Sequence, residues 1–510
     1  MSTSVFTREE IFLLRDKLDR NVVAALVVIF LFFYTLSVLG RWVYNVWFHP
    51  LSKFPGPAFA AASEIPYMYA TARGDLHRWI ARLHDQYGQV VRYSPTALSY
   101  TKAQAWKDIF GHKAGGSGGV PKDLDWYGRP MNGVKGMITA GDEAHARMRR
   151  IFNNAFSDRA LKLHEPMFKK YASLLTTKLR ENVDKDANHK LDMVSWLNFT
   201  TFDVMGDLVF GETFHQLETA TYSEWVRLIF DGIYAVTMNR VIRHLVPTVH
   251  WIVNRLLLRK LAAKREQHFG YASERVRRRL AAKDQKADIW SLVLKAPESR
   301  SLSVGEMNTN ASTFMIAGTE TTATLLSGLL FHLLKNPDKM GKLVQEIRGE
   351  LHTEEDITME RLARLPYLRA CIEEALRIYP PVPTGTMRRT AVEGAMVCGE
   401  FIPGNTMLTV SQYAAFRDAN NWKDAYKFIP ERFIDSAYNS DEKSVLQPFA
   451  VGPRNCLGKN MAYHEMRVLM AYVLLNFDLE LATESEHWDN QKAYILWEKH
   501  PLMCHLKLVR

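Results

Sequence analysis

The sequence predicts a mainly α fold with small β-sheets (α+β), in which a single large domain follows one N-terminal transmembrane helix. Three observations support this prediction. The twenty residues at 21–40 contain no charged side chain, a proline-rich stretch follows them, and the rest alternates long helical patterns with short β-like runs. No internal repeat or second linker interrupts the last region. We therefore expect a flank at 1–20, an anchor at 21–40, a hinge at 41–57 and one domain at 58–510.

The anchor is the run NVVAALVVIFLFFYTLSVLG between Arg20 and Arg41. A helix needs roughly 20 apolar residues to cross the hydrocarbon layer of a bilayer, and this run supplies them. A secretory signal peptide is the alternative, but the run is long for one, begins well inside the chain and lacks a small-residue cleavage site. Charges of both signs flank the run, so they say little about its orientation.

The hinge contains Pro50, Pro55 and Pro57 in the stretch FHPLSKFPGP. Proline lacks the backbone N–H that a helix interior uses and fixes its own φ angle. We expect a stiff, extended connection that helices do not cross.

Apolar residues in the large domain recur at spacings of three and four, as they do on one face of a helix. Short β-like runs lie between these segments. The clearest helical segments are 76–88, 165–183, 307–336 and 366–380, and the clearest β-like runs are 90–94, 395–403 and 479–483. The glycine-rich stretch 114–121 lacks the Lys-Ser/Thr of a phosphate-binding loop, so we interpret it as a mobile loop.

Composition bounds the classes of partner and site. The chain has 65 Lys and Arg against 55 Asp and Glu, and its net charge of +10 suits an anionic membrane or an acidic partner. No nucleic-acid-binding module is recognisable, so we expect no nucleic acid partner. Cysteine occurs at Cys371, Cys398, Cys456 and Cys504, without a C-x-x-C pair. This spacing indicates neither a disulfide framework nor a zinc site and favours a reducing compartment.

Cys456 stands in the stretch FAVGPRNCLG. A lone thiolate is a strong axial ligand for haem iron. Gly452 and Gly458 have no Cβ atom, which lets the backbone turn tightly and approach the flat macrocycle. Arg454 suits a haem propionate because its fork matches a carboxylate, and Phe449 would shield the thiolate from water. Taken alone, Cys456 would be interpreted as an inert buried cysteine.

The full pattern Phe-x-x-Gly-x-Arg-x-Cys-x-Gly and three further motifs resemble the cytochrome P450 family. Glu374-x-x-Arg377 resembles the family's Glu-x-x-Arg helix, Arg432 lies in the stretch PERF, and AGTETT at 317–322 resembles the oxygen-binding part of the long central helix. The order and separation of these motifs match the family over nearly the whole chain. The resemblance implies a haem-thiolate monooxygenase that binds haem b through Cys456.

The resemblance also implies roles for the other motifs. Glu374 and Arg377 are three apart on one helix face and would form a buried, structural cluster with Arg432. Glu320 and Thr321 resemble the family's acid and alcohol pair, which delivers protons during catalysis. The glycine and threonines of this stretch favour a local widening of the helix.

Three positions are similar to those that contact the haem propionates in the family. His145 and Arg149, four apart in HARMRRIFNNAFS, share one helix face. Tryptophan is commoner than histidine at the first of these positions. Arg388 is our choice for a further contact, and Arg389 is the alternative.

The substrate pocket follows from the same resemblance. We expect it between the loop at 112–135, the helices near 210–250, and the residues Phe314, Ala317, Val382 and Met387. The side chains of these regions are largely apolar, which suits a hydrophobic small-molecule substrate.

The anchored form resembles microsomal members of the family, which use dioxygen and electrons from NADPH-cytochrome P450 reductase. Only 54 residues follow Cys456, too few for a flavin or iron–sulfur domain, so we expect a separate reductase. The basic stretch 275–286 is a candidate contact for an acidic partner, although a solvated helix face is the simpler explanation. We expect a single-pass protein of the endoplasmic reticulum membrane with a cytosolic catalytic domain. The sequons at Asn198 and Asn310 would then carry no sugar.

The chain is most similar to filamentous-fungal members that tailor secondary metabolites. The same chemistry can instead desaturate a substrate, close a ring or couple two phenols, and the motifs do not separate these outcomes from hydroxylation. A haem-thiolate isomerase is disfavoured by the intact Glu320–Thr321 pair. A non-enzymatic haem sensor or carrier is the alternative of another class, and NADPH consumption that depends on substrate and reductase would distinguish it.

Overall fold

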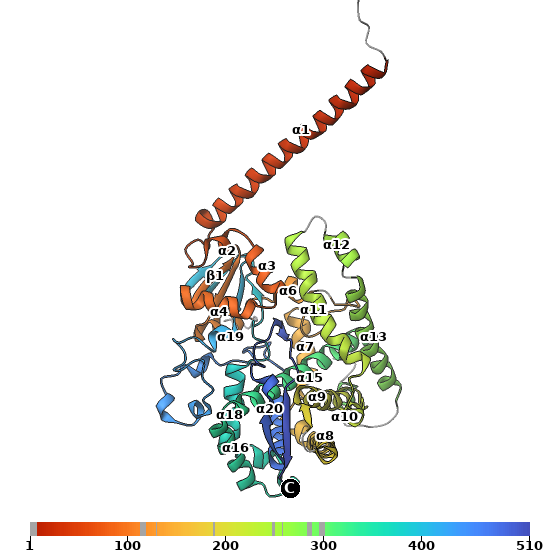
Figure 1. Ribbon diagram of the computed structural model, residues 1–510, viewed down its shortest axis with the longest axis vertical. Coiled ribbons are helices and arrows are strands. Elements are labelled where there is room, and N and C mark those ends of the chain that lie inside the picture. The colour runs from red at the N-terminus through yellow and green to blue at the C-terminus, as the bar shows by residue number, and fades with distance from the viewer. Residues whose placement is uncertain are drawn as a thin grey trace, which may run out of the picture.

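The computed structural model describes residues 8–112, 119–128, 130–186, 189–246, 250–257, 259–282, 288–294 and 301–509. A long N-terminal helix extends away from a body built mainly of helices, and the sheet that contains β1 lies near the base of that helix (Figure 1). Residues 114–118 of the expected glycine-rich loop lie outside the described residues, as do residues 283–286 of the basic stretch.

The predicted helices and strands all form, with ends that shift by a few residues. The α-helices are α1 (Arg8–Val43), α2 (Ala58–Ala62), α3 (Ile65–Ala72), α4 (Leu76–Tyr87), α5 (Ala103–Phe110), α6 (Leu124–Tyr127), α7 (Asp142–Asn153), α8 (Asp158–Lys185), α9 (Met193–Phe210), α10 (Gln216–Thr219), α11 (Glu224–Leu245), α12 (His250–Leu257), α13 (Arg259–Ala281), α14 (Ile289–Leu294), α15 (Val304–Leu334), α16 (Pro337–Glu350), α17 (Met359–Leu362), α18 (Pro366–Ile378), α19 (Gln412–Ala415) and α20 (Lys459–Asn476). The strands are β1 (Val90–Ser94), β2 (Ala97–Tyr100), β3 (Lys190–Asp192), β4 (Arg388–Arg389), β5 (Ala395–Val397), β6 (Glu400–Ile402), β7 (Met407–Val410), β8 (Phe477–Leu481), β9 (Ala493–Tyr494), β10 (Leu496–Trp497) and β11 (Met503–Leu508). Short turns of other helix types are η1 (Tyr44–Phe48), η3 (Glu354–Asp356), η4 (Pro430–Phe433), η5 (Ser436–Tyr438), η6 (Lys443–Val445) and η7 (Thr483–Ser485).

The apolar N-terminal segment is helical and long enough to cross a membrane. Helix α1 continues into the π-helical turn η1, and the stretch Asn21–Phe48 has a mean hydropathy of 2.8 with none of its most apolar window buried. A second helix of sufficient length and hydropathy, Val304–Leu334, is 78% buried over its most apolar window. That helix is the core helix α15, so α1 is the candidate anchor.

No helix runs through Pro50, Pro55 or Pro57, as expected, but the segment 41–57 is not an extended linker from end to end. Helical structure continues through Phe48, and Leu51 is fully buried against the strands of the first sheet. The Asn45 side chain donates a hydrogen bond to the Ala62 carbonyl at 3.0 Å, and the Arg92 N–H donates to the Pro55 carbonyl at 2.7 Å. The prolines therefore shape a segment that packs on the domain.

The sheets are small and lie apart from one another. The first has the order β1-β2-β7-β4, with β2 and β7 parallel and the other pairs antiparallel. The second has the order β3-β11-β8, and β5-β6 and β9-β10 are two-stranded. The β-like run 395–403 forms the β5-β6 hairpin, because Cys398 and Gly399 both have positive φ angles, as a tight two-residue turn requires.

Helix α15 runs through the core and packs against α9, α13, α18 and α20. It begins at a capping box, in which Ser303 and Glu306 each bond the other's backbone N–H. A Cβ at Gly318 would lie 2.5 Å from the Met205 sulfur, so this glycine allows close packing on α9. The expected widening is not present, because α15 is α-helical from Val304 to Leu334.

Both sequon asparagines are buried. Asn198 donates to the Tyr222 hydroxyl at 2.9 Å. Asn310 accepts a hydrogen bond from the Met137 N–H at 2.9 Å, which ties the segment before α7 to α15. Neither amide is available on the surface of the folded domain.

Candidate functional site

The segment that carries Cys456 is held by its own backbone. The Cys456 N–H donates to the Phe449 carbonyl at 2.9 Å, and α20 begins directly after Gly458. Gly452 has a φ of +77°, and a Cβ there would lie 2.0 Å from the Phe110 carbonyl oxygen, so only glycine fits. Gly458 has a φ of −86°, and a Cβ there would be 4.0 Å from its nearest neighbour, a Phe156 ring carbon. Close approach to a macrocycle at Gly458 stays a prediction.

The Cys456 side chain is accessible, although protein is packed closely around it. This packing raises the pKa of the thiol, while a hydrogen bond from the Gly458 N–H and the charges of Arg149 and Lys459 act in the opposite direction. The same groups would stabilise a thiolate.

Arg149 and Phe449 both make contacts that hold this segment in place. The Arg149 guanidinium donates to the Asn455 carbonyl at 2.5 Å and to the Asn455 side chain at 2.8 Å. Arg149 therefore holds the residue before Cys456 in place. A contact between Arg149 and a haem propionate stays a prediction. The Phe449 ring packs on Tyr463, with ring centroids 5.3 Å apart.

Four basic side chains gather beside this segment: Arg454, Arg388, Lys122 and His145. Burial and the charges of Arg388 and Arg454 lower the pKa of Lys122 to about 7. Burial and the charges of Arg454, Lys122 and Arg149 lower the pKa of His145 to about 4. The two arginines therefore disfavour a positive charge on Lys122 and His145 in this partly dry environment.

Two atoms of this basic cluster lack partners among the described residues: Nε of Arg388 and Nη1 of Arg454. The Arg388 Nη1 donates to the Val120 carbonyl at 2.9 Å, and the Arg454 Nη2 donates to Asp142 at 2.7 Å. Unpaired buried donors and mutual repulsion both favour an anionic group here. The two propionates of haem would fit this requirement, and the Cys456 sulfur would be available as an axial donor.

The structure distinguishes Arg388 from Arg389. Arg389 turns the other way and donates to Asp123 at 2.8 Å and to the Asn405 carbonyl at 2.9 Å. Lys122 joins Arg388 through an isolated β-bridge and was not predicted from the sequence. It lies in an irregular segment, where no periodicity or motif marks it.

The Glu374 cluster has the geometry that the spacing suggests. The Arg377 guanidinium donates to both Glu374 oxygens, at 2.7 and 2.8 Å, and the Arg432 Nε donates to Glu374 at 3.3 Å. All three side chains are fully buried. Arg432 also pairs with Asp441 at 3.0 Å, a partner that the sequence motifs did not indicate. The cluster ties α18 to the irregular region before Cys456.

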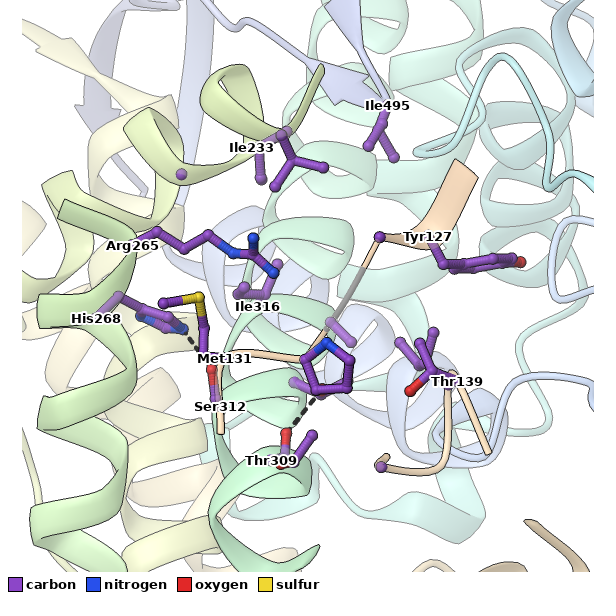
Figure 2. A pocket seen from close by; sticks show the side chains of 18 of the residues that line it. Tyr127, Met131, Thr139, Ile233, Arg265, His268, Thr309, Ser312, Ile316 and Ile495 are labelled. Atoms are coloured by element: carbon purple, nitrogen blue, oxygen red, sulfur yellow. Dashed lines mark hydrogen bonds between the residues drawn. The ribbon is translucent and has the colours of Figure 1, made fainter. Parts of the chain in front are cut away.

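A cavity of about 390 Å³ lies beside α15, between α11, α13 and the segment around β10. Figure 2 shows the side chains that surround it. Ala317, Thr321 and Val382 are part of its wall, together with Ile233, Ile316 and Leu496. Its surface is mostly apolar, which suits a hydrophobic ligand.

Phe314 and Met387 lie elsewhere. The Phe314 ring packs in the core against Phe152 and Phe156, with ring centroids 4.9 and 5.9 Å apart. Met387 is 1% exposed and accepts a weak hydrogen bond from the Tyr93 hydroxyl. Both side chains point into the core and away from the cavity, so neither is part of the cavity wall.

Glu320 and Thr321 diverge from each other. The Thr321 side chain faces the cavity and its hydroxyl donates to the Ala317 carbonyl at 2.5 Å. Glu320 is turned to another face of α15, where it contacts Lys499 and accepts a hydrogen bond from Thr324 at 3.3 Å. Burial raises the pKa of Glu320, and Lys499 opposes that effect. Lys499 was not predicted, because it lies in an irregular segment after β10.

A neutral histidine borders the cavity. Burial lowers the pKa of His268 to about 4. The Trp225 indole N–H donates to Nδ1 of His268 at 2.6 Å, so the ring hydrogen is on Nε2, which contacts the Ser312 hydroxyl at 2.8 Å (Figure 2). The Ser312 hydroxyl therefore keeps its own hydrogen for another acceptor.

Comparison with known proteins extends over nearly the whole chain. A family model described as "Cytochrome P450" matches residues 55–505. The chain is 46% identical to the cytochrome P450 monooxygenase efuB of Hormonema carpetanum, over 95% of this chain and 96% of that protein. It is 45% identical to the cytochrome P450 monooxygenase FUM2 of Gibberella moniliformis, over 90% and 98%, and 42% identical to the cytochrome P450 monooxygenase lcsI of Purpureocillium lilacinum, over 94% of each chain.

Proposed function

Because the chain belongs to the cytochrome P450 family, we propose that it binds haem b through Cys456 and oxidises an apolar small molecule in the cavity beside α15. The family's activity makes the protein a haem-dependent monooxygenase, which uses a redox partner, a substrate and dioxygen. Haem, when bound, activates dioxygen so that one oxygen atom enters the substrate and the other leaves as water.

The residues of the chain hold the cofactor and shield it. Cys456 supplies the axial sulfur, and the Gly458 N–H donates to it. Arg454, Arg388 and His145 hold the propionates, with Lys122 as a fourth donor. The single observation that carries this assignment is the cluster of basic groups with unpaired donors beside a lone cysteine.

Proton delivery involves Thr321 directly and Glu320 at a distance. The Thr321 hydroxyl is at the cavity wall and can hold a water molecule there. Glu320 is one residue away but bound to Lys499, so it must turn or relay through water to reach the same place.

The apolar helix α1 suggests membrane anchoring, and we place the protein at the endoplasmic reticulum with its domain in the cytosol. NADPH-cytochrome P450 reductase then supplies the electrons. The named relatives come from fungi, which supports a place in fungal secondary metabolism. Hydroxylation is the primary assignment, and desaturation, ring formation and phenol coupling use the same site.

Two measurements test this function. Cys456→Ser should lose the thiolate-type absorption of the reduced protein with carbon monoxide, and a normal thiolate spectrum in that variant would remove Cys456 from the mechanism. The chain should then be expressed with the reductase and given extracts of candidate metabolites. A product that gains an oxygen atom in an NADPH-dependent reaction is expected, whereas NADPH consumption that no substrate changes would favour a non-enzymatic haem protein.

A further inference from the structure

Two neighbouring cavities share part of their walls, including the side chain of Arg265. The mostly apolar cavity beside α15 shares Trp126, Gly128, Val236 and Arg265 with a neighbouring polar cavity of about 420 Å³. The polar cavity lies toward α6, α11 and α12. The two cavities therefore lie side by side, one lined mainly by apolar side chains and the other mainly by polar ones.

Arg240 is the first unusual feature of the polar cavity. Its side chain is 5% exposed, and its guanidinium carbon lies 5.3 Å from the centre of the Trp126 ring. Nε and Nη1 have no hydrogen-bond partner among the described residues. A buried guanidinium with unpaired donors is costly, so an anionic partner would be strongly favoured there.

The nearby acid does not neutralise Arg240. Asp125, which is part of the same wall, already pairs with Arg243 at 2.8 Å and with Nε2 of His244 at 2.8 Å. The hydrogen bonds that the His244 ring donates to Asp125 and Glu64 raise the pKa of His244 to about 9. Among the described residues that line the polar cavity, Asp125 is the one acid and it is already paired, so Arg240 has no carboxylate partner there.

Arg265 connects the two compartments. It extends from α13 across the apolar cavity in the direction of Ile316, above the His268 ring (Figure 2). Burial lowers the pKa of its guanidinium, which shows that surrounding protein limits its contact with water. A charge–charge contact at this position is screened less than one on the surface.

We propose that Arg240 and Arg265 form a subsite for the carboxylate of an otherwise apolar substrate. The carbon chain of that substrate lies along Trp126 and Val236 and continues toward Ala317 and Thr321, all of which border the cavities. Guanidinium forks match a carboxylate through paired N–H donors, so the subsite fixes which end of the molecule faces the haem side. This inference rests on the proposed function, since it names the substrate class of the same site.

The test uses the full haem-loaded chain and matched probes. Radiolabelled dodecanoate and hexadecanoate are compared with their methyl esters by equilibrium dialysis. The wild-type protein should bind the acids about tenfold or more tightly than the esters. Arg265→Gln and Arg240→Gln should each remove most of this preference while the affinity for the esters changes little.

Matched variants separate charge from shape. Arg277→Gln, at an exposed position of α13 that pairs with Glu274, should bind both probes like the wild type. Arg240→Lys keeps the charge and should retain part of the preference, so it replaces Arg240→Gln if that variant does not fold. Equal wild-type affinity for acid and ester, no binding of either acid, or an equal loss of both probes in the variants would contradict the subsite.

The carbon monoxide spectrum distinguishes failure of this inference from failure of the proposed function. A wild-type protein with the thiolate spectrum and no carboxylate preference would overturn the subsite alone. A protein that lacks the thiolate spectrum would overturn the proposed function, and with it the inference that rests on it.

Discussion

The ammonium group of Lys499 contacts a carboxylate oxygen of Glu320 inside the protein, where the two side chains are 3% and 1% exposed. The Lys499 ammonium also donates to the Thr324 hydroxyl at 2.8 Å. Glu320 belongs to α15, whereas Lys499 lies between β10 and β11. The pair therefore ties the C-terminal strands to the central helix, and it holds the acid away from the neighbouring Thr321.

Removal of one member of this pair should destabilise the protein more than removal of both. Lys499→Met leaves a buried carboxylate without its partner, and we expect a loss of about 3 kcal/mol in the free energy of unfolding. Glu320→Gln instead leaves the buried ammonium group of Lys499 without its carboxylate partner. The double variant should be more stable than the sum of the two losses predicts, as measured by urea denaturation. Strictly additive losses would show that the two groups are not coupled.

Thr321→Ala tests proton delivery without disturbing cofactor binding. The Thr321 hydroxyl is at the cavity wall, so its loss should keep the thiolate–carbon monoxide spectrum. Oxygenated product per NADPH should fall about tenfold or more, with hydrogen peroxide released instead. Thr313→Ala is the matched control, because Thr313 also borders the cavity and donates to a backbone carbonyl of α15. If both variants couple NADPH to product fully, Thr321 has no role in proton delivery.

Arg432→Leu tests the buried cluster. This change leaves Asp441, which is 1% exposed, without its ion-pair partner. It also removes one of the two guanidinium groups that pair with Glu374. The expected loss is about 3–5 kcal/mol in the free energy of unfolding. Arg361→Leu breaks an ion pair with Asp356 in which the Arg361 side chain is 53% exposed, and it should cost about 1 kcal/mol or less. Comparable losses in thermal or urea denaturation would contradict a special role for the buried cluster.

The burial of Glu465 predicts that the stability of the protein depends on pH. It is fully buried on α20, and burial raises its pKa from 4.5 to about 8, against the opposing effect of the Thr322 hydroxyl. The folded state therefore holds the proton more tightly than the unfolded state does. The stability that this provides is complete below about pH 4.5 and is lost as the pH rises through about 8.

Glu465→Gln should remove that part of the pH dependence. Melting temperatures of the wild type and the variant, measured between pH 4.5 and 8, should diverge because only the wild type loses this contribution. Glu480→Gln, at an exposed position, should follow the wild type. Parallel curves for the wild type and Glu465→Gln would show that Glu465 does not titrate in this range.

Local spacing made some of these relationships predictable from the sequence. Glu374 and Arg377 are three apart on a helix, and a helix of that pitch places their side chains together whatever surrounds it. Lys122, Asp441 and Lys499 lie in irregular segments, and their partners are set by tertiary packing that no short-range pattern records. The divergence of Glu320 from Thr321 has the same origin, since adjacent helical residues point to different faces and a distant lysine decides what one of them meets.

The hinge shows a different kind of limit. Its prolines indicated a free linker, whereas the burial of Leu51 and the hydrogen bond from Asn45 attach the segment to the domain. The sequence predicts that Gly318 favours a local widening of the helix, whereas in the structure Gly318 allows α15 to pack closely against Met205. In each case the sequence identified an unusual position and tertiary contacts determined what it does.

The docked junction after α1 has a mechanical consequence. A flexible tether would let the domain rotate freely above a bilayer, but here helical structure leads through η1 directly into Leu51, which is buried in the domain. In a membrane spanned by α1, the axis of this helix and the orientation of the domain would be coupled. Spanning helices tilt to match the thickness of the bilayer, so a thicker or thinner membrane would incline the whole domain rather than the helix alone.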